Sequence, residues 1–217
     1  THSKQETDKL HQLLGKNIKV TTAFHPTYAD LASRSISKES AKEQLGLSGP
    51  VLLFFGFVRE YKGLSTLLKA LPDVTKQKDV TLLVVGEFWK DKRTYLDMIQ
   101  DLGISRAVMI KDGYVANEEI GPYFAAADLV VQPYVSVSGS GVCQLAYGFG
   151  RPVIATDVGS LNEVVEDRIN GRIVPPRDPK ALAEAIVESL QPDILELYTV
   201  NAARVTTTLL SLKARNS

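Results

Sequence analysis

Short, continuously apolar runs alternate along the chain with segments of helical periodicity. The runs are rich in β-branched and aromatic residues and end close to glycine, proline or a charged residue, so we predict strands rather than buried helices. The predicted strands are 18–24, 51–57, 80–85, 129–131, 152–155 and 172–174. Continuous apolarity is typical of parallel strands that helices cover on both faces.

The segments between these runs carry helical signals. Leucines at 64, 67, 68 and 71 share one helix face, and Gly46 stands where a helix C-cap is expected. The predicted helices are 37–45, 64–76, 91–102, 117–127, 142–149 and 178–190. Strands and helices that alternate at this spacing indicate βαβ units, and hence an α/β domain with a doubly wound parallel sheet.

Composition and charge argue against several classes of protein. Lysine plus arginine equals aspartate plus glutamate, 25 against 25, so no net field attracts nucleic acid or an acidic membrane. The single cysteine, Cys143, excludes an intrachain disulfide and a multi-cysteine metal site. No apolar run approaches the roughly 18 residues of a membrane helix, and the first residues lack the apolar segment of a signal peptide. We therefore expect a reducing, cytoplasmic setting.

The loop at 56–63 carries two cations, Arg59 and Lys62, between flanking glycines. It follows a predicted buried strand and leads into a helix, a position where cations and backbone N–H groups favour an anion. We interpret Arg59 and Lys62 as candidate catalytic groups that stabilise a departing diphosphate. The alternative is a solvated turn in which Arg59 pairs with Glu60 or with a neighbouring helix.

The loop at 136–141 consists of small residues and precedes the predicted helix 142–149. Its backbone N–H groups and hydroxyls suit an anion cradle, and the alternative is a flexible surface turn. Gly139 and Gly141 match two glycines of a dinucleotide fingerprint, and Asp157 follows at a strand end. The third glycine is missing, because Gln144 occupies its position, so an NAD site is only weakly indicated.

Other candidate side chains have a structural and a functional interpretation. Glu163 either contacts a sugar hydroxyl or is a carboxylate at a helix start, and its spacing favours the helix start. Trp89 either stacks on a base or packs in the interior, and we favour packing. Cys143 is expected in the core, and Asn170 with Gly171 predicts a tight structural turn into the last strand. The chain has no D-x-D sequence of the kind that holds a divalent metal on a nucleotide sugar.

The chain resembles the C-terminal, donor-binding domain of glycosyltransferase family 4, the group 1 enzymes of GT-B architecture. The resemblance covers residues 18–190 and depends on the order and spacing of several stretches. These are 54–64 (FFGFVREYKGL), 82–86 (LLVVG), 113–120 (GYVANEEI), 127–133 (ADLVVQP), 150–159 (GRPVIATDVG), 163–165 (EVV), 170–171 (NG) and 175–178 (PPRD).

The resemblance implies a Rossmann-like parallel sheet with helices on both faces and a sugar-nucleotide site at the strand ends. Lys62 matches the family's diphosphate-binding lysine, whereas the usual arginine position is Phe57, so Arg59 takes that role from a shifted place. Val137 and Leu145 stand where the family has paired glutamates, and Ser138, Ser140 or Gln144 replace them. The implied donor-binding residues are Gly56, Phe57, Gly86, Gly113, Tyr114, Ser138, Gly139, Ser140, Gly141, Val142, Gln144 and Glu163.

The resemblance also implies a domain organisation and partners. Residues 1–17 would be the end of an absent acceptor-binding domain with a linking helix, 18–191 the donor-binding domain, and 192–217 a tail that crosses back and frays at Thr206–Thr208. The expected substrate is a nucleotide sugar such as a UDP- or GDP-sugar, with no metal and no other cofactor. The acceptor would be a glycan, a lipid or a small molecule bound by the absent half, as in polysaccharide biosynthesis, with peripheral membrane association open to the full-length enzyme.

Three functions remain for comparison. The leading one is the donor site of a retaining glycosyltransferase of hexosyltransferase type, a chain that we expect to be inactive for transfer by itself. The missing glutamates prompt the second, a non-catalytic nucleotide-sugar-binding or regulatory module. The third, an NAD-dependent oxidoreductase domain, fails on the missing glycine and on the lack of a substrate domain.

Overall fold

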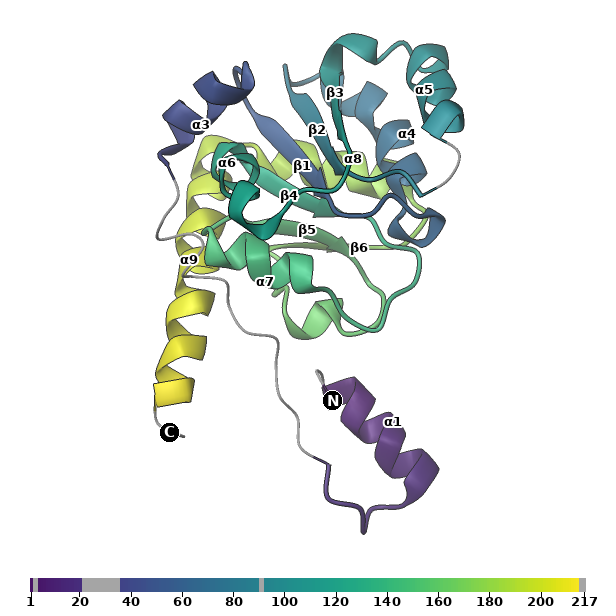
Figure 1. The fold of residues 1–217 in the computed structure, drawn as a ribbon, viewed down its shortest axis with the longest axis vertical. Helices are drawn as coiled ribbons and strands as arrows, with labels where there is room; N and C mark the ends of the chain where they lie inside the picture. Colours follow the sequence, from purple (N-terminus) through teal and green to yellow (C-terminus); the bar gives the residue numbers. More distant parts are fainter. Residues whose placement is uncertain (2–3, 21–35, 90–91, 215–217) are drawn as a thin grey trace.

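A computed structural model describes residue 1 and residues 4–20, 36–89 and 92–214 (Figure 1). Its centre is a sheet of six strands, all of whose ladders are parallel. The strands are β1 (Val51–Phe55), β2 (Thr81–Gly86), β3 (Val108–Asp112), β4 (Leu129–Gln132), β5 (Val153–Thr156) and β6 (Gly171–Val174). Within the predicted strand 18–24, residues 18–20 are not extended in a sheet, and 21–24 lie outside the described residues.

The strand order is β3-β2-β1-β4-β5-β6, so the direction of winding reverses between β1 and β4. Register is fixed by pairs such as Leu53 with Leu83 and Leu53 with Val130. In doubly wound sheets, the loops at the carboxyl ends of the two strands beside such a reversal diverge and leave a crevice. The topology therefore places the loops after β1 and β4 side by side.

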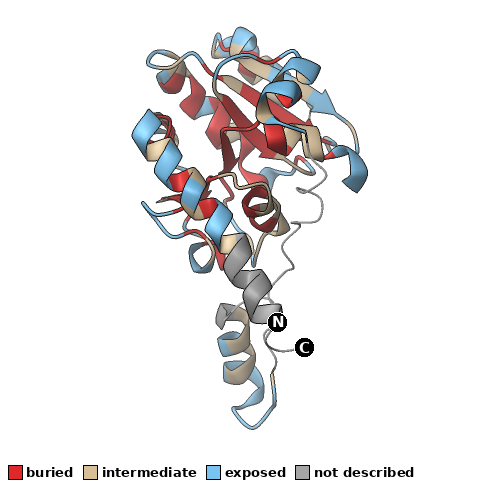
Figure 2. Ribbon diagram, turned by 90° about the vertical axis from the view of Figure 1, so that its left-hand side faces the viewer, coloured by how far each residue is buried: buried red, intermediate tan, exposed pale blue. Residues whose placement is uncertain are grey.

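Helices cover both faces of the sheet, as predicted (Figures 1 and 2). One face packs against α4 (Leu64–Thr75), α5 (Lys92–Asp101) and α8 (Pro179–Ser189). The other packs against α3 (Lys38–Leu45), α6 (Gly121–Ala126), α7 (Gly141–Gly148) and α9 (Pro192–Ala214). Alternate residues of β1 enter the two cores, Leu52 and Phe54 on the first face and Val51 and Leu53 on the second. The remaining helix, α1 (Lys4–Leu14), precedes the domain.

Local signals placed several helix ends correctly. The Ser37 hydroxyl accepts a hydrogen bond from Ser40 N at the start of α3, and Gly46 ends that helix in the left-handed conformation. Asp178 caps α8 in the same way through Ala181 N. These ends need only residues close in sequence, which is why the pattern predicts them.

One predicted helix requires correction, and one strand was not predicted. Residues 117–127 are a 3₁₀ turn, Asn117–Glu119, followed by the separate helix α6, because Pro122 has no N–H to continue the first turn. Thr206–Thr208, where the sequence predicts fraying, are part of α9, which continues to Ala214. Strand β3 was not predicted, because it is an edge strand with polar positions and lacks a continuous apolar run.

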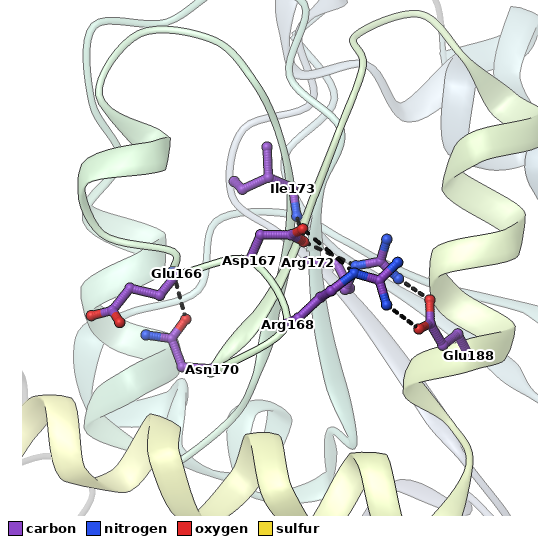
Figure 3. Close-up of polar contacts among 7 residues, drawn as sticks. All are labelled: Glu166, Asp167, Arg168, Asn170, Arg172, Ile173 and Glu188. Carbon is purple, nitrogen blue, oxygen red and sulfur yellow. Dashed lines mark hydrogen bonds and ion pairs between the residues drawn. The ribbon is translucent and has the colours of Figure 1, made fainter.

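The turn before β6 is held by polar contacts, as its predicted structural role requires (Figure 3). The Asn170 side-chain oxygen accepts hydrogen bonds from Glu166 N at 2.9 Å and from the Tyr147 hydroxyl at 2.8 Å. Arg172 joins Asp167 to Glu188 of α8, and Arg168 also contacts Glu188. The network fixes α8 to the last strand, which agrees with a structural role for the turn.

A buried carboxylate closes the amino-terminal edge of the sheet. Asp128 forms ion pairs with Lys38 and Lys42 of α3 and accepts a hydrogen bond from Val51 N at 2.8 Å. Burial by itself would raise the pKa of Asp128, but the hydrogen bonds from the two lysines hold it below its ordinary value. The buried carboxylate of Asp128 therefore has its counter-charges within the fold.

Candidate functional site

The loops after β1 and β4 touch at the carboxyl edge of the sheet. Val135 N donates to Tyr61 O at 2.7 Å, which ties the two loops together. Gly63 sits at φ 71°, and a Cβ there would lie 1.9 Å from Pro133 O, so only glycine allows this approach. The close contact fixes the loop that carries Arg59 and Lys62 against the neighbouring strand.

Lys62 lies inside this junction. Lys62 is 8% exposed, and its ammonium nitrogen lies 5.6 Å from the centre of the Tyr134 ring. The nitrogen also lies directly over the end of β1, since a Cβ on Gly56 would be 2.7 Å from it. Tyr134, which the sequence did not single out, is the missed residue here, because the adjacent Pro133 and the end of a strand were its only signals.

The charge on Lys62 has no carboxylate partner among the described residues. Burial, together with the smaller effect of the nearby Arg59 charge, lowers the pKa of Lys62 from 10.5 to about 8. The ammonium form therefore still predominates at neutral pH. Burying a cation without a counter-charge is costly, which makes Lys62 a candidate for binding an anion.

A cavity of about 160 Å³ opens at the ends of β1, β2 and β3; Lys62 does not line it, but its nitrogen lies close to Gly56, which does. Five residues of the predicted donor site line it: Gly56, Phe57, Gly86, Gly113 and Tyr114. The wall is mainly apolar, and it includes Leu145 of α7 and the 3₁₀ turn at Asn117. An apolar, partly aromatic wall beside a buried cation suits a planar base attached to a phosphate.

Gly86 brings β2 close to β1 at this point. Its φ is 144°, and a Cβ there would lie 2.2 Å from Gly56 O. The absent side chain lets the two strand ends meet at the floor of the cavity. Gly56 N also donates to Val85 O at 2.9 Å, which extends the pairing of β1 and β2 to the cavity edge.

Arg59 is separated from this cavity. Its guanidinium lies 4.4 Å from the centre of the Trp89 ring and 5.9 Å from that of Phe57, so it stacks on the first and reaches the edge of the second. Arg59 and Trp89 line a second cavity, of about 480 Å³, on the far side of the loop. Trp89 is 58% exposed, so the prediction that it packs in the interior was wrong.

The serine–glycine turn packs against the loop after β5. Ser160 Oγ donates to Ser138 O at 2.6 Å, and Ser140 Oγ accepts from Val142 N at 3.2 Å as the N-cap of α7. Gly139 lies against the same Ser160 hydroxyl, and Gly141 begins the helix. The turn thus supplies a helix start at the crevice, although the capping hydroxyl already engages one of its N–H groups.

Gln144 is buried on α7, and its side-chain oxygen lacks a hydrogen-bond partner among the described residues. Gln132 at the end of β4 has the same unpaired oxygen, while its nitrogen donates to Cys143 Sγ at 3.1 Å. Burial raises the pKa of the Cys143 thiol to about 12, which confirms its place in the core. Glu163 ends an exposed 3₁₀ turn and does not line the first cavity.

The described part of the chain has neither a cluster of metal-binding side chains nor a membrane-spanning helix. Histidine, cysteine, aspartate and glutamate side chains form no group of three that could hold a metal ion in the regions 4–20, 36–89 and 92–214. In those same regions no helix has the length and apolarity needed to cross a membrane.

The structure is an α/β domain with a doubly wound parallel sheet, and the loops at the carboxyl ends of its strands carry the buried Lys62. Residues 49–192 match the family model described as glycosyl transferases group 1. The chain therefore belongs to the group 1 glycosyltransferase family, which confirms the predicted resemblance and the GT-B, Rossmann-like fold class.

Individual relatives agree with this assignment. An uncharacterised glycosyltransferase of Methanocaldococcus jannaschii is 30% identical over 155 residues, which are 71% of this chain and 39% of that protein. A D-inositol 3-phosphate glycosyltransferase of Corynebacterium urealyticum is 31% identical over 164 residues, covering 71% of this chain and 38% of that protein. The chain thus spans about two fifths of the length of these relatives.

Solved structures share the fold. Sucrose-phosphate synthase from Thermosynechococcus elongatus superposes with a TM-score of 0.81 at 26% identity, over 96% of this chain and 53% of that one. HepE from Anabaena, solved in complex with UDP and glucose, gives a TM-score of 0.80 at 22% identity, over 99% of this chain and 62% of that one.

Proposed function

We propose that this chain is the nucleotide-sugar donor domain of a retaining glycosyltransferase, and that a separate acceptor-binding domain completes the enzyme. The observation that carries the proposal is the buried ammonium of Lys62 at the switch point, which has no carboxylate partner among the described residues and lies close to Gly56 of the apolar cavity. A nucleoside diphosphate matches both features, since its base is planar and its diphosphate is anionic. Family membership and the UDP and UDP-glucose complexes of HepE support the same ligand class.

Lys62 would act by stabilising the diphosphate as negative charge develops on it. A unit charge pair at 4 Å contributes about 4 kcal/mol at an effective dielectric of 20, and more of this is realised as the leaving group gains charge. Because Tyr134 and the strand ends already fix the ammonium, little reorganisation accompanies the reaction. Arg59 would contribute a second cation only after leaving the Trp89 ring.

The proposed chemistry is transfer of a sugar with retained anomeric configuration and without a metal, as the family resemblance implies. The bond between the sugar and the diphosphate breaks, the acceptor oxygen bonds to the same face of the sugar, and the acceptor's proton passes to the departing diphosphate. Lys62 and N–H groups at the start of α7 stabilise the charge that develops on the diphosphate. Gln144, with its unpaired oxygen, is the described residue best suited to take over a contact that glutamates make elsewhere in the family.

Calorimetric titration of the 217-residue chain with UDP, GDP and NAD tests the donor site. We expect a nucleoside diphosphate to bind with a dissociation constant that rises at least about 30-fold in Lys62→Ala, the equivalent of 2 kcal/mol. Lys69→Ala, which removes an exposed lysine of α4, is the matched control and should bind normally. Binding of NAD alone, or diphosphate binding independent of Lys62, would refute the proposal.

Transfer by the full-length enzyme separates catalysis from binding. We expect Lys62→Ala to lose transfer, measured as nucleoside diphosphate released, whereas Lys69→Ala retains it. If the wild-type full-length enzyme binds the nucleotide but transfers no sugar to any acceptor, the chain is a non-catalytic nucleotide-sugar module.

A further inference from the structure

The second cavity, on the outer side of the β1–α4 loop, has a chemistry of its own. Its volume of about 480 Å³ falls within the roughly 300–1,000 Å³ of ligand pockets. It lies between the first turn of α4, the chain after β2, and α5. The first cavity, which we assign to the nucleotide, shares none of its lining residues.

An aromatic platform forms one side of this cavity. Trp89 is the only tryptophan of the chain, and more than half of its surface is exposed. Backbone pairing holds it in place, since Val58 N donates to Glu87 O at 2.8 Å and Val58 bridges to Phe88. The ring is therefore displayed by the ends of two strands rather than by a free loop.

Two opposite charges line the same cavity without neutralising each other. Arg59 and Glu60 are adjacent, yet neither is in an ion pair among residues 36–89 and 92–214. Arg59 uses its face to stack on Trp89, which leaves its N–H edge as a row of donors. Glu60 offers acceptors only. The hydroxyls of Ser65 and Thr94, which also line the cavity, can both donate and accept hydrogen bonds.

This combination selects a neutral, polyhydroxylated ligand. An anion would satisfy Arg59 but would be repelled by Glu60, and a cation would meet the reverse problem. A sugar hydroxyl accepts from a guanidinium and donates to a carboxylate, while the C–H face of a pyranose packs on an indole ring. Met98 of α5 gives the cavity an apolar, adaptable wall.

We propose that this cavity, which we name the Trp89 cavity after its platform, is a saccharide subsite distinct from the nucleotide site. It would hold a neutral sugar unit of the acceptor or of the product chain, and in this respect it rests on the proposed function. The β1–α4 loop would then carry the donor diphosphate on one side, through Lys62, and a saccharide on the other, through Arg59 and Glu60.

The single tryptophan makes the test direct. Maltose, cellobiose and sucrose are titrated to about 10 mM while Trp89 fluorescence is followed, with calorimetry as a second measurement. We expect at least one disaccharide to saturate the signal. Calorimetry should show about tenfold weaker binding to Trp89→Ala, with partial recovery in Trp89→Phe, whose ring keeps the platform. Met109→Ala, an exposed change on the edge strand β3, is the control and should bind as the wild type does.

Measuring both UDP binding and disaccharide binding for each variant separates the two proposals. Lys62→Met should lose UDP binding and keep disaccharide binding. Disaccharide binding that survives Trp89→Ala, or no binding of the three sugars by a chain that binds UDP, would overturn the saccharide subsite and leave the donor site standing. Disaccharide binding with no nucleoside diphosphate binding would instead overturn the donor site.

Discussion

Replacing Lys62 by methionine should stabilise the ligand-free protein while it removes the diphosphate site. Methionine keeps most of the apolar stem that packs beside Tyr134 and deletes the ammonium group, which has no carboxylate partner in the described structure. Folding lowers the pKa of Lys62 from 10.5 to about 8, chiefly by burial, and such a difference corresponds to about 3 kcal/mol of unfavourable charge burial. We therefore expect the free energy of unfolding of Lys62→Met at pH 7 to exceed that of the wild type by about 1–3 kcal/mol.

The pH dependence of this difference has a definite sign. Below about pH 8 the lysine is charged in both the folded and the unfolded chain, so the full cost of burying the charge is present in the wild type. Between pH 8 and 10.5 the unfolded chain binds more protons at Lys62 than the folded chain, and the wild type becomes more stable relative to the variant. Above pH 10.5 the lysine is neutral in both states, and the advantage of methionine disappears.

Urea denaturation of both proteins at pH 7 and pH 10 measures this difference, because every other titrating group cancels between them. Lys69→Met, an exposed change on α4, serves as the control and should alter stability little at either pH. Adding UDP at about 100 times its dissociation constant should raise the stability of the wild type by about 2.7 kcal/mol and leave Lys62→Met unchanged. A less stable Lys62→Met, or a stability difference that is the same at both pH values, would contradict the burial argument.

Two further substitutions and one labelling experiment test other parts of the structure. Gly63→Ala places a Cβ 1.9 Å from Pro133 O and should lower the free energy of unfolding by at least about 3 kcal/mol, whereas Gly46→Ala, at φ 65° in open space, should lower it by only about 1 kcal/mol in the same urea titration. Asp128→Ala removes the carboxylate partner of Lys38 and Lys42 and the acceptor of Val51 N, although Lys42 keeps its hydrogen bond to Gly49 O; thermal unfolding should show a loss of about 3 kcal/mol at pH 7. We expect a smaller loss near pH 3, because the stabilisation that comes with the lowered pKa of Asp128 fades in acid. Cys143, whose pKa is raised to about 12 by burial, should react with a thiol reagent only after the chain unfolds, and prompt labelling of the folded protein would show that α7 opens.

The sequence predicted those elements whose signals are local or continuous. β1, β2, β4 and β5 are buried on both faces, so their residues are apolar without interruption, and the βαβ order then implies parallel pairing. β3 was not predicted, because it lies at the sheet edge, where polar residues such as Lys111 and Asp112 are tolerated and interrupt the apolar run. Its pairing with β2 becomes evident only when the sheet is assembled.

The candidate site was predicted in position but not in detail. Chain order alone placed Lys62 and the glycines at strand ends, and the structure brings Gly56, Gly86 and Gly113 into one cavity. The direction of Arg59 could not be predicted, because it depends on Trp89, which is 30 positions away and belongs to another strand end. Arg59 and Trp89 meet because of the register in which β1 pairs with β2, and a local sequence motif does not specify that register.

Buried charges at the two edges of the sheet differ in whether the fold supplies them with partners. At the amino-terminal edge Asp128 has two lysine partners, and beside β6 Arg172 has two carboxylates, so these charges are matched within the fold. At the carboxyl edge Lys62 is buried against Tyr134 without a partner among the described residues, at a cost that an apolar side chain of the same length would avoid. A purely structural lysine at this position is hard to reconcile with that cost, whereas a lysine whose counter-charge arrives with the substrate accounts for both the burial and the lowered pKa.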